Sequence, residues 1–266
     1  MASLFDLKEL YRDALYDLFA GSNREKWKNS NYKIHPFVTQ VGSNFKNSKS
    51  KILFVGKSTN GWQGPVPFDI TNLKSSIDNY IDNNAFNGNN SDRLCCRDDQ
   101  MEWVENYWDQ PILNGNKPCN TPFWQVVHET SVLAEERTYR WSSCIAWSEL
   151  YKFAPPSSKK LGTPTESQRR IQKKHCWSIL DKEVETIEPK NIVFFTSNWE
   201  KDYLDHLGLS EKDFNESTKF LIYPLKKAIW NNGNNDTTII LAEHPQGSTG
   251  TIEQKAKAII ELLDRL

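Results

Sequence analysis

Two short apolar runs, each followed at once by a Gly-rich polar turn, constrain the fold of this chain most strongly. Residues 52–55 lead into the turn 56–61, and residues 237–242 lead into the turn 243–250. Apolar runs bounded by turn residues are typical of buried strands. In open α/β sheets, ligands bind where the carboxyl ends of the strands meet. We therefore expect both turns to lie at one edge of a sheet.

Further strand and helix patterns alternate along the chain. Strands are expected at 142–147 and 191–196, with a short strand or edge segment at 219–223. Helical periodicity marks residues 4–20, 70–81, 101–108, 122–136, 165–188, 199–207 and 251–266. This alternation predicts a three-layer α/β/α fold, with a mostly parallel sheet of about four or five strands between helices.

The length of the chain and the place of its first confident strand predict the domain organisation. A chain of 266 residues can bury a full core within one domain. Residues 1–49 are expected to form an N-terminal helical extension packed on the core. Residues 50–266 are expected to form the α/β domain itself.

The net charge and the lengths of the apolar runs argue against a strongly basic nucleic-acid-binding protein and against a membrane protein. The formal net charge of -1 creates no global positive field, so any contact with nucleic acid or anionic lipid has to be local. The run from Arg169 to Lys174 gives one helix face such a positive patch, or else a merely solvated surface. No run approaches the roughly 18 to 20 apolar residues that cross a bilayer, so no membrane partner is expected.

The cysteines and histidines indicate neither a disulfide framework nor a metal site. Five cysteines are an odd number, and no signal-peptide pattern precedes them, which favours reduced thiols and a cytoplasmic location. The histidines and cysteines have no shared metal-ligand spacing. We therefore expect neither a metal nor another cofactor.

The first turn combines glycine with polar side chains. Gly56 lets backbone amides approach a ligand closely, and Lys57 and Ser58 follow it. These residues are not a phosphate-binding loop, because that motif requires a glycine where this chain has Lys51. A turn without a ligand is the structural alternative.

Two later strand ends supply the other candidate residues. Ser148 and Glu149 follow the second strand, where a pocket lies in folds of this class. Glu243 and His244 open the last turn and suit a base and its electrostatic partner, with Ser248 close behind. Turn or core positions are the structural alternative for each.

The order of these elements resembles the uracil-DNA glycosylase superfamily. Residues 54–61, FVGKSTNG, are similar to the loop that positions the hydrolytic water in that family. Residues 145–150, IAWSEL, lie where its internal, base-reading strand ends. Residues 243–248, EHPQGS, are similar to its last loop, His-Pro-Ser, which presses on the DNA and polarises the uracil. The resemblance implies a glycosylase-like fold over residues 50–266.

The resemblance also implies a role for each candidate residue. Asn60 would orient the hydrolytic water, and His244 would stabilise charge on the departing base. Trp62 or Phe68 would stack on a flipped base, while Glu149 would read its edge. Because an ionised Glu only accepts hydrogen bonds, an amino-bearing ring such as cytosine, adenine or guanine would suit Glu149. The remaining substrate contacts would come from Gly56, Lys57, Ser58, Ser148, Glu243 and Ser248.

The chain also departs from the family pattern. No Asp occupies the first loop, no Pro follows at the corresponding position, and Ser148 or Glu149 replaces the base-reading Asn. Two functions stay open. One is hydrolysis of an N-glycosidic bond to a nucleobase in DNA or a related nucleotide. The other is a catalytically inactive nucleic-acid or nucleotide binding module of the same fold. A hydrolase with Ser58 or Ser248 as nucleophile is weaker, because no Gly-x-Ser-x-Gly turn is present.

Overall fold

The computed structural model describes most of the chain and divides it into two units. The described residues are 4–58, 66–82, 100–108, 120–136, 140–156, 163–216, 223–231, 233 and 235–263. Unit 1 comprises residues 1–39, 56–94 and 148–187, and unit 2 comprises residues 40–55, 95–147 and 188–266. Both units are discontinuous in sequence, so the division differs from the expected boundary between residues 49 and 50.

A mixed sheet whose centre is parallel lies mostly in unit 2, and two of its strands end in residues of unit 1. Among the described residues this sheet has seven strands, in the order β2-β5-β3-β7-β10-β9-β8. Their bounds are β2 (Gln40–Val41), β5 (Ile145–Tyr151), β3 (Ile52–Ser58), β7 (Asn191–Phe194), β10 (Asp236–Ala242), β9 (Leu225–Asn231) and β8 (Asn215–Glu216). Strands β3, β7 and β10 are parallel, with Ile52, Asn191 and Thr238 in register. Their carboxyl ends therefore lie at the same edge of the sheet.

The predicted α/β class is confirmed, but the sheet is larger than expected. Strand β9 pairs antiparallel with β10, and β8 pairs antiparallel with β9. Lys226 and Lys227 make β9 too polar to stand out as a buried strand in the sequence. The expected strand at 142–147 is displaced, because Trp141–Cys144 forms a 3-10 turn, η5, and β5 begins only at Ile145.

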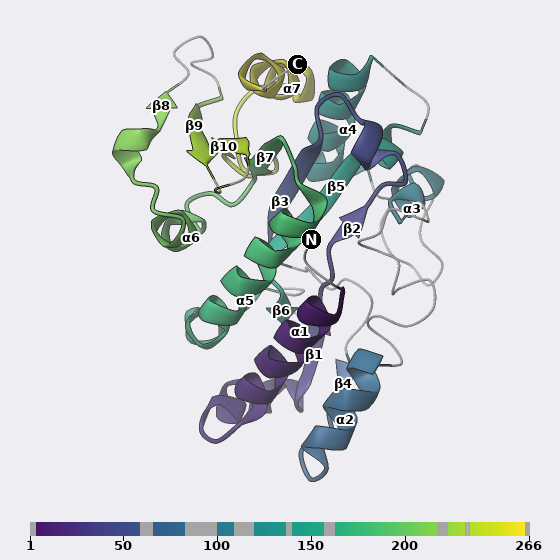
Figure 1. Cartoon of the computed structure of the whole chain (residues 1–266), viewed down its shortest axis with the longest axis vertical. Coiled ribbons are helices and arrows are strands. Elements are labelled where there is room, and N and C mark those ends of the chain that lie inside the picture. The colour runs from purple at the N-terminus through teal and green to yellow at the C-terminus, as the bar shows by residue number, and fades with distance from the viewer. Residues whose placement is uncertain are drawn as a thin grey trace. The chain divides into compact units, whose positions relative to one another are not determined.

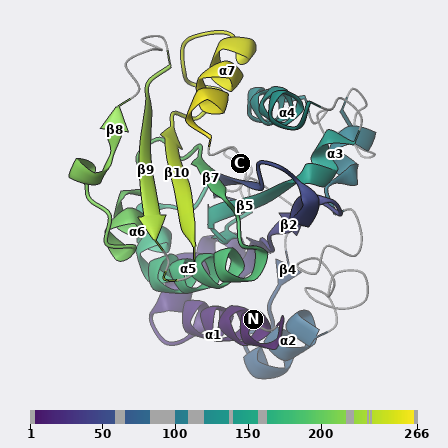
Figure 2. The same ribbon diagram turned by 45° about the horizontal axis from the view of Figure 1, so that its top comes forward.

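All helices expected from the sequence are present. In unit 2 they are α3 (Glu102–Asn106), α4 (Pro122–Glu135), α6 (Lys201–His206) and α7 (Ile252–Leu262). Pro122 occupies the first turn of α4, where its missing N–H costs nothing. Thr251 caps α7 by accepting a hydrogen bond from Gln254 N. Helices α4 and α7 pack side by side in unit 2 (Figure 2).

Unit 1 is built on two long helices. Helix α1 (Leu4–Phe19) packs along α5 (Glu166–Ile187), and α2 (Leu73–Tyr80) packs on α1 (Figure 1). A 3-10 helix, η1 (Asn23–Ser30), follows α1. The remaining elements form a small antiparallel sheet of β4 (Val66–Pro67), β1 (Lys33–Pro36) and β6 (Phe153–Ala154). The apolar stripe of α1, including Leu7, Tyr11 and Leu15, is buried as its spacing predicts.

None of the helices in the described part of the chain combines the length and apolar character that a membrane span requires.

In unit 2, the loop before β3 holds the carboxylate of Glu135, the last residue of α4. Glu135 accepts hydrogen bonds from Ser48 Oγ at 2.8 Å, Lys49 N at 3.1 Å, Ser50 N at 3.0 Å and Ser50 Oγ at 2.5 Å. Burial acts to raise the pKa of Glu135, but these hydrogen bonds together outweigh it and lower the pKa. The ionised carboxylate thus joins the end of α4 to the start of β3.

Replacing Glu135 by Gln should destabilise unit 2 at neutral pH and flatten the acid limb of its stability profile. A folded pKa below the unfolded value means that the carboxylate stabilises the fold above its unfolded pKa of about 4.3. That contribution is lost as the pH falls through the folded pKa. We expect a loss of about 1–2 kcal/mol in the free energy of unfolding at pH 7, from urea denaturation. A difference from wild type that stays constant down to about pH 3 would contradict this account.

Candidate functional site

The structure distributes the predicted site residues over both units. Gly56, Lys57, Ser58, Phe68, Ser148 and Glu149 belong to unit 1, and Glu243, His244 and Ser248 belong to unit 2. Asn60 and Trp62 lie outside the described residues. The two groups are considered in turn.

In unit 1, the carboxylate of Glu149 lies directly on Gly56. A Cβ atom added to Gly56 would be 2.5 Å from Glu149 Oε2 and 2.9 Å from Oε1 and Cδ. Glu149 is only 5% exposed, so its carboxylate has little room to move aside. Glycine at position 56 is therefore what lets these two predicted residues touch. Lys57 follows half-buried, and Ser58 is buried.

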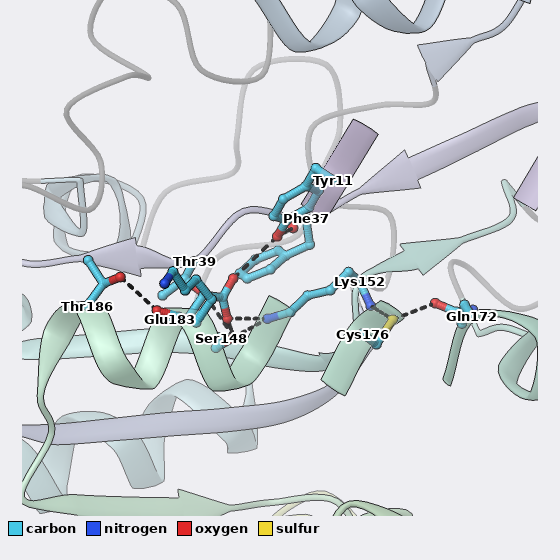
Figure 3. Close-up of polar contacts among 10 residues, drawn as sticks. Tyr11, Phe37, Thr39, Ser148, Lys152, Gln172, Cys176, Glu183 and Thr186 are labelled. Atoms are coloured by element: carbon cyan, nitrogen blue, oxygen red, sulfur yellow. Dashed lines mark hydrogen bonds and ion pairs between the residues drawn. The ribbon is translucent and has the colours of Figure 1, made fainter. Parts of the chain in front are cut away.

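Ser148 is fully buried and belongs to a polar network in unit 1 (Figure 3). Its hydroxyl accepts hydrogen bonds from Lys152 Nζ at 2.5 Å and Thr39 Oγ1 at 2.9 Å, and donates to Glu183 Oε2 at 2.9 Å. Lys152 Nζ and Glu183 Oε2 form an ion pair at 2.5 Å, with both side chains 0% exposed. Tyr11 donates to the other oxygen of Glu183 at 3.3 Å. Ser148 is thus structural, which corrects the expectation that it contacts a substrate.

Phe68 is also a core residue of unit 1. Its ring lies 5.1 Å from the ring of Phe19 and 5.7 Å from that of Tyr80, between ring centres. It is buried, because α1 and α2 cover it. This placement corrects the expectation that Phe68 stacks on a base.

In unit 2, the turn after β10 is held through its backbone carbonyls. Tyr223 donates a hydrogen bond from its hydroxyl to Glu243 O at 2.7 Å. The ammonium of Lys255, on α7, donates to Pro245 O at 2.9 Å and Ser248 O at 3.1 Å. Lys255 is 3% exposed, and this burial lowers its pKa, although the carboxylate of Glu243 acts in the opposite direction. Hydrogen bonds from Tyr223 and Lys255 to its backbone carbonyls therefore hold the turn in place.

Two contacts orient the imidazole of His244, and a third holds its backbone. Its backbone N–H donates to Ser197 Oγ at 2.9 Å, and its Nδ1 accepts from Gln246 N at 3.3 Å. The ring of Phe123 stacks on the imidazole, with centres 6.1 Å apart and planes 24° apart. Because Nδ1 is an acceptor, the neutral ring carries its hydrogen on Nε2. His244 can therefore offer a hydrogen-bond donor to a ligand.

The turn after β7 is strained beside His244. Ser197 and Asn198 both have positive φ angles, 46° and 71°. Each such residue costs roughly 1 kcal/mol or more, and strain of this kind concentrates at functional sites. Sequence reasoning missed this pair. The available signal was a Ser-Asn sequence after a buried strand, since Asn tolerates the left-handed region better than most residues.

A cavity of about 680 Å³ opens at these two turns in unit 2. Its volume falls within the range of about 300–1,000 Å³ that is usual for small-molecule sites. The apolar part of its wall consists of Leu204, Leu209, Phe214, Pro224, Leu241 and Ala242. The polar part includes Ser197, Asn198, Glu200, Lys201, Asp205, Lys226, Glu243 and His244. Two predicted residues, Glu243 and His244, thus line one cavity.

Ser248 has a different place in the turn. Its hydroxyl donates to Pro245 O at 3.3 Å, and Gly247 N donates to His244 O at 3.0 Å. Both hydrogen bonds close the turn on itself. We therefore infer that Ser248 stabilises the conformation of the turn that contains His244.

Within the described residues, no three His, Cys, Asp or Glu side chains are grouped so that they could hold a metal ion. Comparison of the chain with protein-family models and with curated proteins finds no match.

Proposed function

We propose that this protein recognises a nucleobase in DNA or in a related nucleotide, with the cavity beside His244 as its binding site. The proposed fold is the three-layer α/β/α arrangement of the uracil-DNA glycosylase superfamily. The His-Pro turn after the last parallel strand is similar to the last loop of that family. The observation that carries the proposal is the place of His244 in the wall of a cavity of suitable size, with its Nδ1 accepting a hydrogen bond from Gln246 N.

The composition of the cavity wall supports this proposal. A planar heterocycle needs apolar contact for its faces and a few polar groups for its edge. Leu204 and the half-buried ring of Phe214 supply apolar surface. Lys201 and Lys226 are exposed cations in the same wall, beside the carboxylates of Glu200, Asp205, Glu211 and Glu243.

Hydrolysis of the N-glycosidic bond is the activity that we propose for this site. The departing base develops negative charge, and a preorganised donor stabilises that charge without having to reorient. Tyr223 and Lys255 hold the turn through hydrogen bonds to its backbone carbonyls before any ligand binds. The Nε2–H of His244 is therefore the proposed preorganised donor. By the resemblance alone, Asn60 would orient the water and Trp62 would stack on the base.

Other residues have roles only by the resemblance to the glycosylase superfamily. Glu149 would read base identity by accepting hydrogen bonds from an exocyclic amino group, with Gly56, Lys57 and Ser58 as further substrate contacts. Replacing Glu149 by Gln should therefore alter the preference among cytosine, adenine and guanine. An unchanged preference would remove this assignment.

Strand cleavage at abasic sites tests the proposed activity. Single- and double-stranded oligonucleotides carrying uracil, hypoxanthine, xanthine or common lesions are incubated with the protein and then treated with alkali. His244→Ala should reduce strand breaks by about 10²-fold or more, because it removes the proposed donor. His206→Ala is the matched control, since His206 is an exposed histidine in the same unit. Equal cleavage by wild type and His244→Ala would contradict the proposal.

A catalytically inactive binding module is the second candidate function, and the absence of Asp from the first loop favours it. In that case the wild-type protein should bind one of these oligonucleotides in a fluorescence anisotropy titration and produce no breaks. His244→Ala should still weaken that binding.

A further inference from the structure

Among the described side chains that line the cavity beside His244, one carboxylate is buried. Glu200 is 6% exposed, whereas the other three carboxylates of the wall are exposed, those of Asp205, Glu211 and Glu243. An exposed carboxylate keeps its hydrogen bonds to water, but a buried one depends on donors from the protein or from a ligand. The donors that surround Glu200 therefore decide its role.

Thr196 holds one of the two carboxylate oxygens of Glu200. Its hydroxyl, which is fully buried, donates a hydrogen bond to Oε2. Within the described part of the chain, Oε1 accepts no hydrogen bond, and no Lys, Arg or His side chain forms an ion pair with Glu200. Oε1 is nevertheless not enclosed in the core, so its accessible side is the cavity that Glu200 lines. An N–H group of a ligand is the kind of donor that this oxygen lacks.

The backbone around Glu200 is held by hydrogen bonds. Before it, Trp199 N donates to Thr196 O at 3.2 Å. After it, Tyr203 N and Leu204 N donate to the carbonyl of Glu200, at 2.8 and 2.9 Å. The hydroxyl of Thr196 holds the carboxylate itself. The position of this acceptor is therefore set before a ligand binds.

Glu200 and His244 lie on neighbouring turns of unit 2. Strands β7 and β10 are parallel neighbours, with Phe194 opposite Leu241 (Figure 2). The turns that follow them are joined by the hydrogen bond from His244 N to Ser197 Oγ. The cavity wall thus presents a donor at Nε2 of His244 and an acceptor at Oε1 of Glu200. The edge of an amino-bearing heterocycle presents the complement, because a ring nitrogen or carbonyl accepts and the amino group donates.

We propose that Glu200 is the specificity-determining residue of this cavity and selects a heterocycle with an exocyclic amino group. This inference rests on the proposed function, since it names the substrate class of the same site. A carbonyl oxygen in place of the amino group would face Oε1 and leave two buried acceptors with no donor between them. A site built to hydrogen-bond one polar group strongly rejects an analogue that lacks it. Glu149 has a similar role only by the family resemblance, whereas Glu200 lines the cavity itself.

Two pairs of 2′-deoxynucleosides test this selection, because the members of each pair exchange an amino group for a carbonyl. The pairs are deoxycytidine with deoxyuridine and deoxyadenosine with deoxyinosine, titrated into the full chain by isothermal titration calorimetry. In the pair that fits the cavity, the wild-type protein should bind the amino member at least about tenfold more tightly. Glu200→Gln should reduce that ratio at least about tenfold, because an amide whose oxygen stays bonded to Thr196 turns an N–H donor toward the ligand.

Two controls separate this inference from the proposed function. Glu253→Gln removes the same charge at an exposed position of unit 2 outside the cavity wall, and should leave the ratio almost unchanged. His244→Ala should weaken binding but keep the preference for the amino member. Equal binding of the two members, or a ratio that Glu200→Gln leaves unchanged, would overturn the inference while the cavity remains a nucleobase site. Binding of none of the four nucleosides would overturn the proposed function and this inference with it.

Discussion

Replacing Glu183 by alanine should lower the free energy of unfolding of unit 1 by about 3–5 kcal/mol. The carboxylate is 0% exposed and accepts hydrogen bonds from Lys152, Ser148 and Tyr11. Its removal would leave the ammonium of Lys152 buried without a counter-charge. An uncompensated buried charge is among the most costly defects that a single substitution creates. Urea denaturation of the full chain measures the loss.

A double variant separates the cost of leaving one buried charge unpaired from the net contribution of the ion pair to stability. Replacing Lys152 by Met and Glu183 by Leu removes both charges, and should cost far less than Glu183→Ala alone. Glu185→Ala is the matched control, because Glu185 lies two residues further along α5 and forms only an exposed ion pair with Lys182. It should cost less than about 1 kcal/mol. A stability of Glu183→Ala within about 1 kcal/mol of wild type would show that the buried pair is wrongly placed.

Gly42→Ala should destabilise unit 2 by about 2–3 kcal/mol. A Cβ atom at position 42 would lie 2.3 Å from Ser143 O and 2.5 Å from Ser142 O. These are backbone atoms, held in place because Gly42 N donates to Ile145 O and Asn44 N donates to Ser143 O, both at 2.9 Å. The overlap can be relieved only by shifting the chain, which places this substitution at the upper end of ordinary overpacking costs.

A second glycine provides the matched control for Gly42→Ala. A Cβ atom at Gly247 would meet no atom within 4 Å, and this glycine has no positive φ angle. Gly247→Ala should therefore change the midpoint of urea denaturation very little. Equal effects at positions 42 and 247 would contradict the steric account, because the cause would then be general to glycine replacement.

The central strands and the helices could be predicted from the sequence because their signals are local. Strands β3, β7 and β10 each contain a continuous apolar run, as expected for strands covered on both faces, although β3 continues through Gly56 and Lys57 to Ser58, where a turn was predicted. The spacing of apolar residues likewise located α1 and α4. Strand β9 was missed, because its buried residues Leu225 and Ala228 are separated by two lysines.

The candidate site depends on contacts between distant residues, which a local pattern does not contain. Ser148 was expected to face a ligand, since it is a polar residue near the end of a strand. Its actual partner Glu183 lies 35 positions later, on another element. The sequence also did not predict the positive φ angles of Ser197 and Asn198 or the hydrogen bond from Lys255 to Pro245 O. By contrast, the position of His244 after the last parallel strand followed directly from the apolar run before it.

Histidine-selective ¹⁵N NMR tests the central claim most directly. We expect the imidazole of His244 to carry a hydrogen on Nε2, because its Nδ1 accepts a hydrogen bond, and we expect the Nε2 signal to shift as a nucleobase-containing oligonucleotide is added. The signals of His206, exposed on α6, should not move. A His244 ring protonated on Nδ1, or His244 signals that stay unchanged while the oligonucleotide binds, would contradict the claim that this imidazole recognises the base.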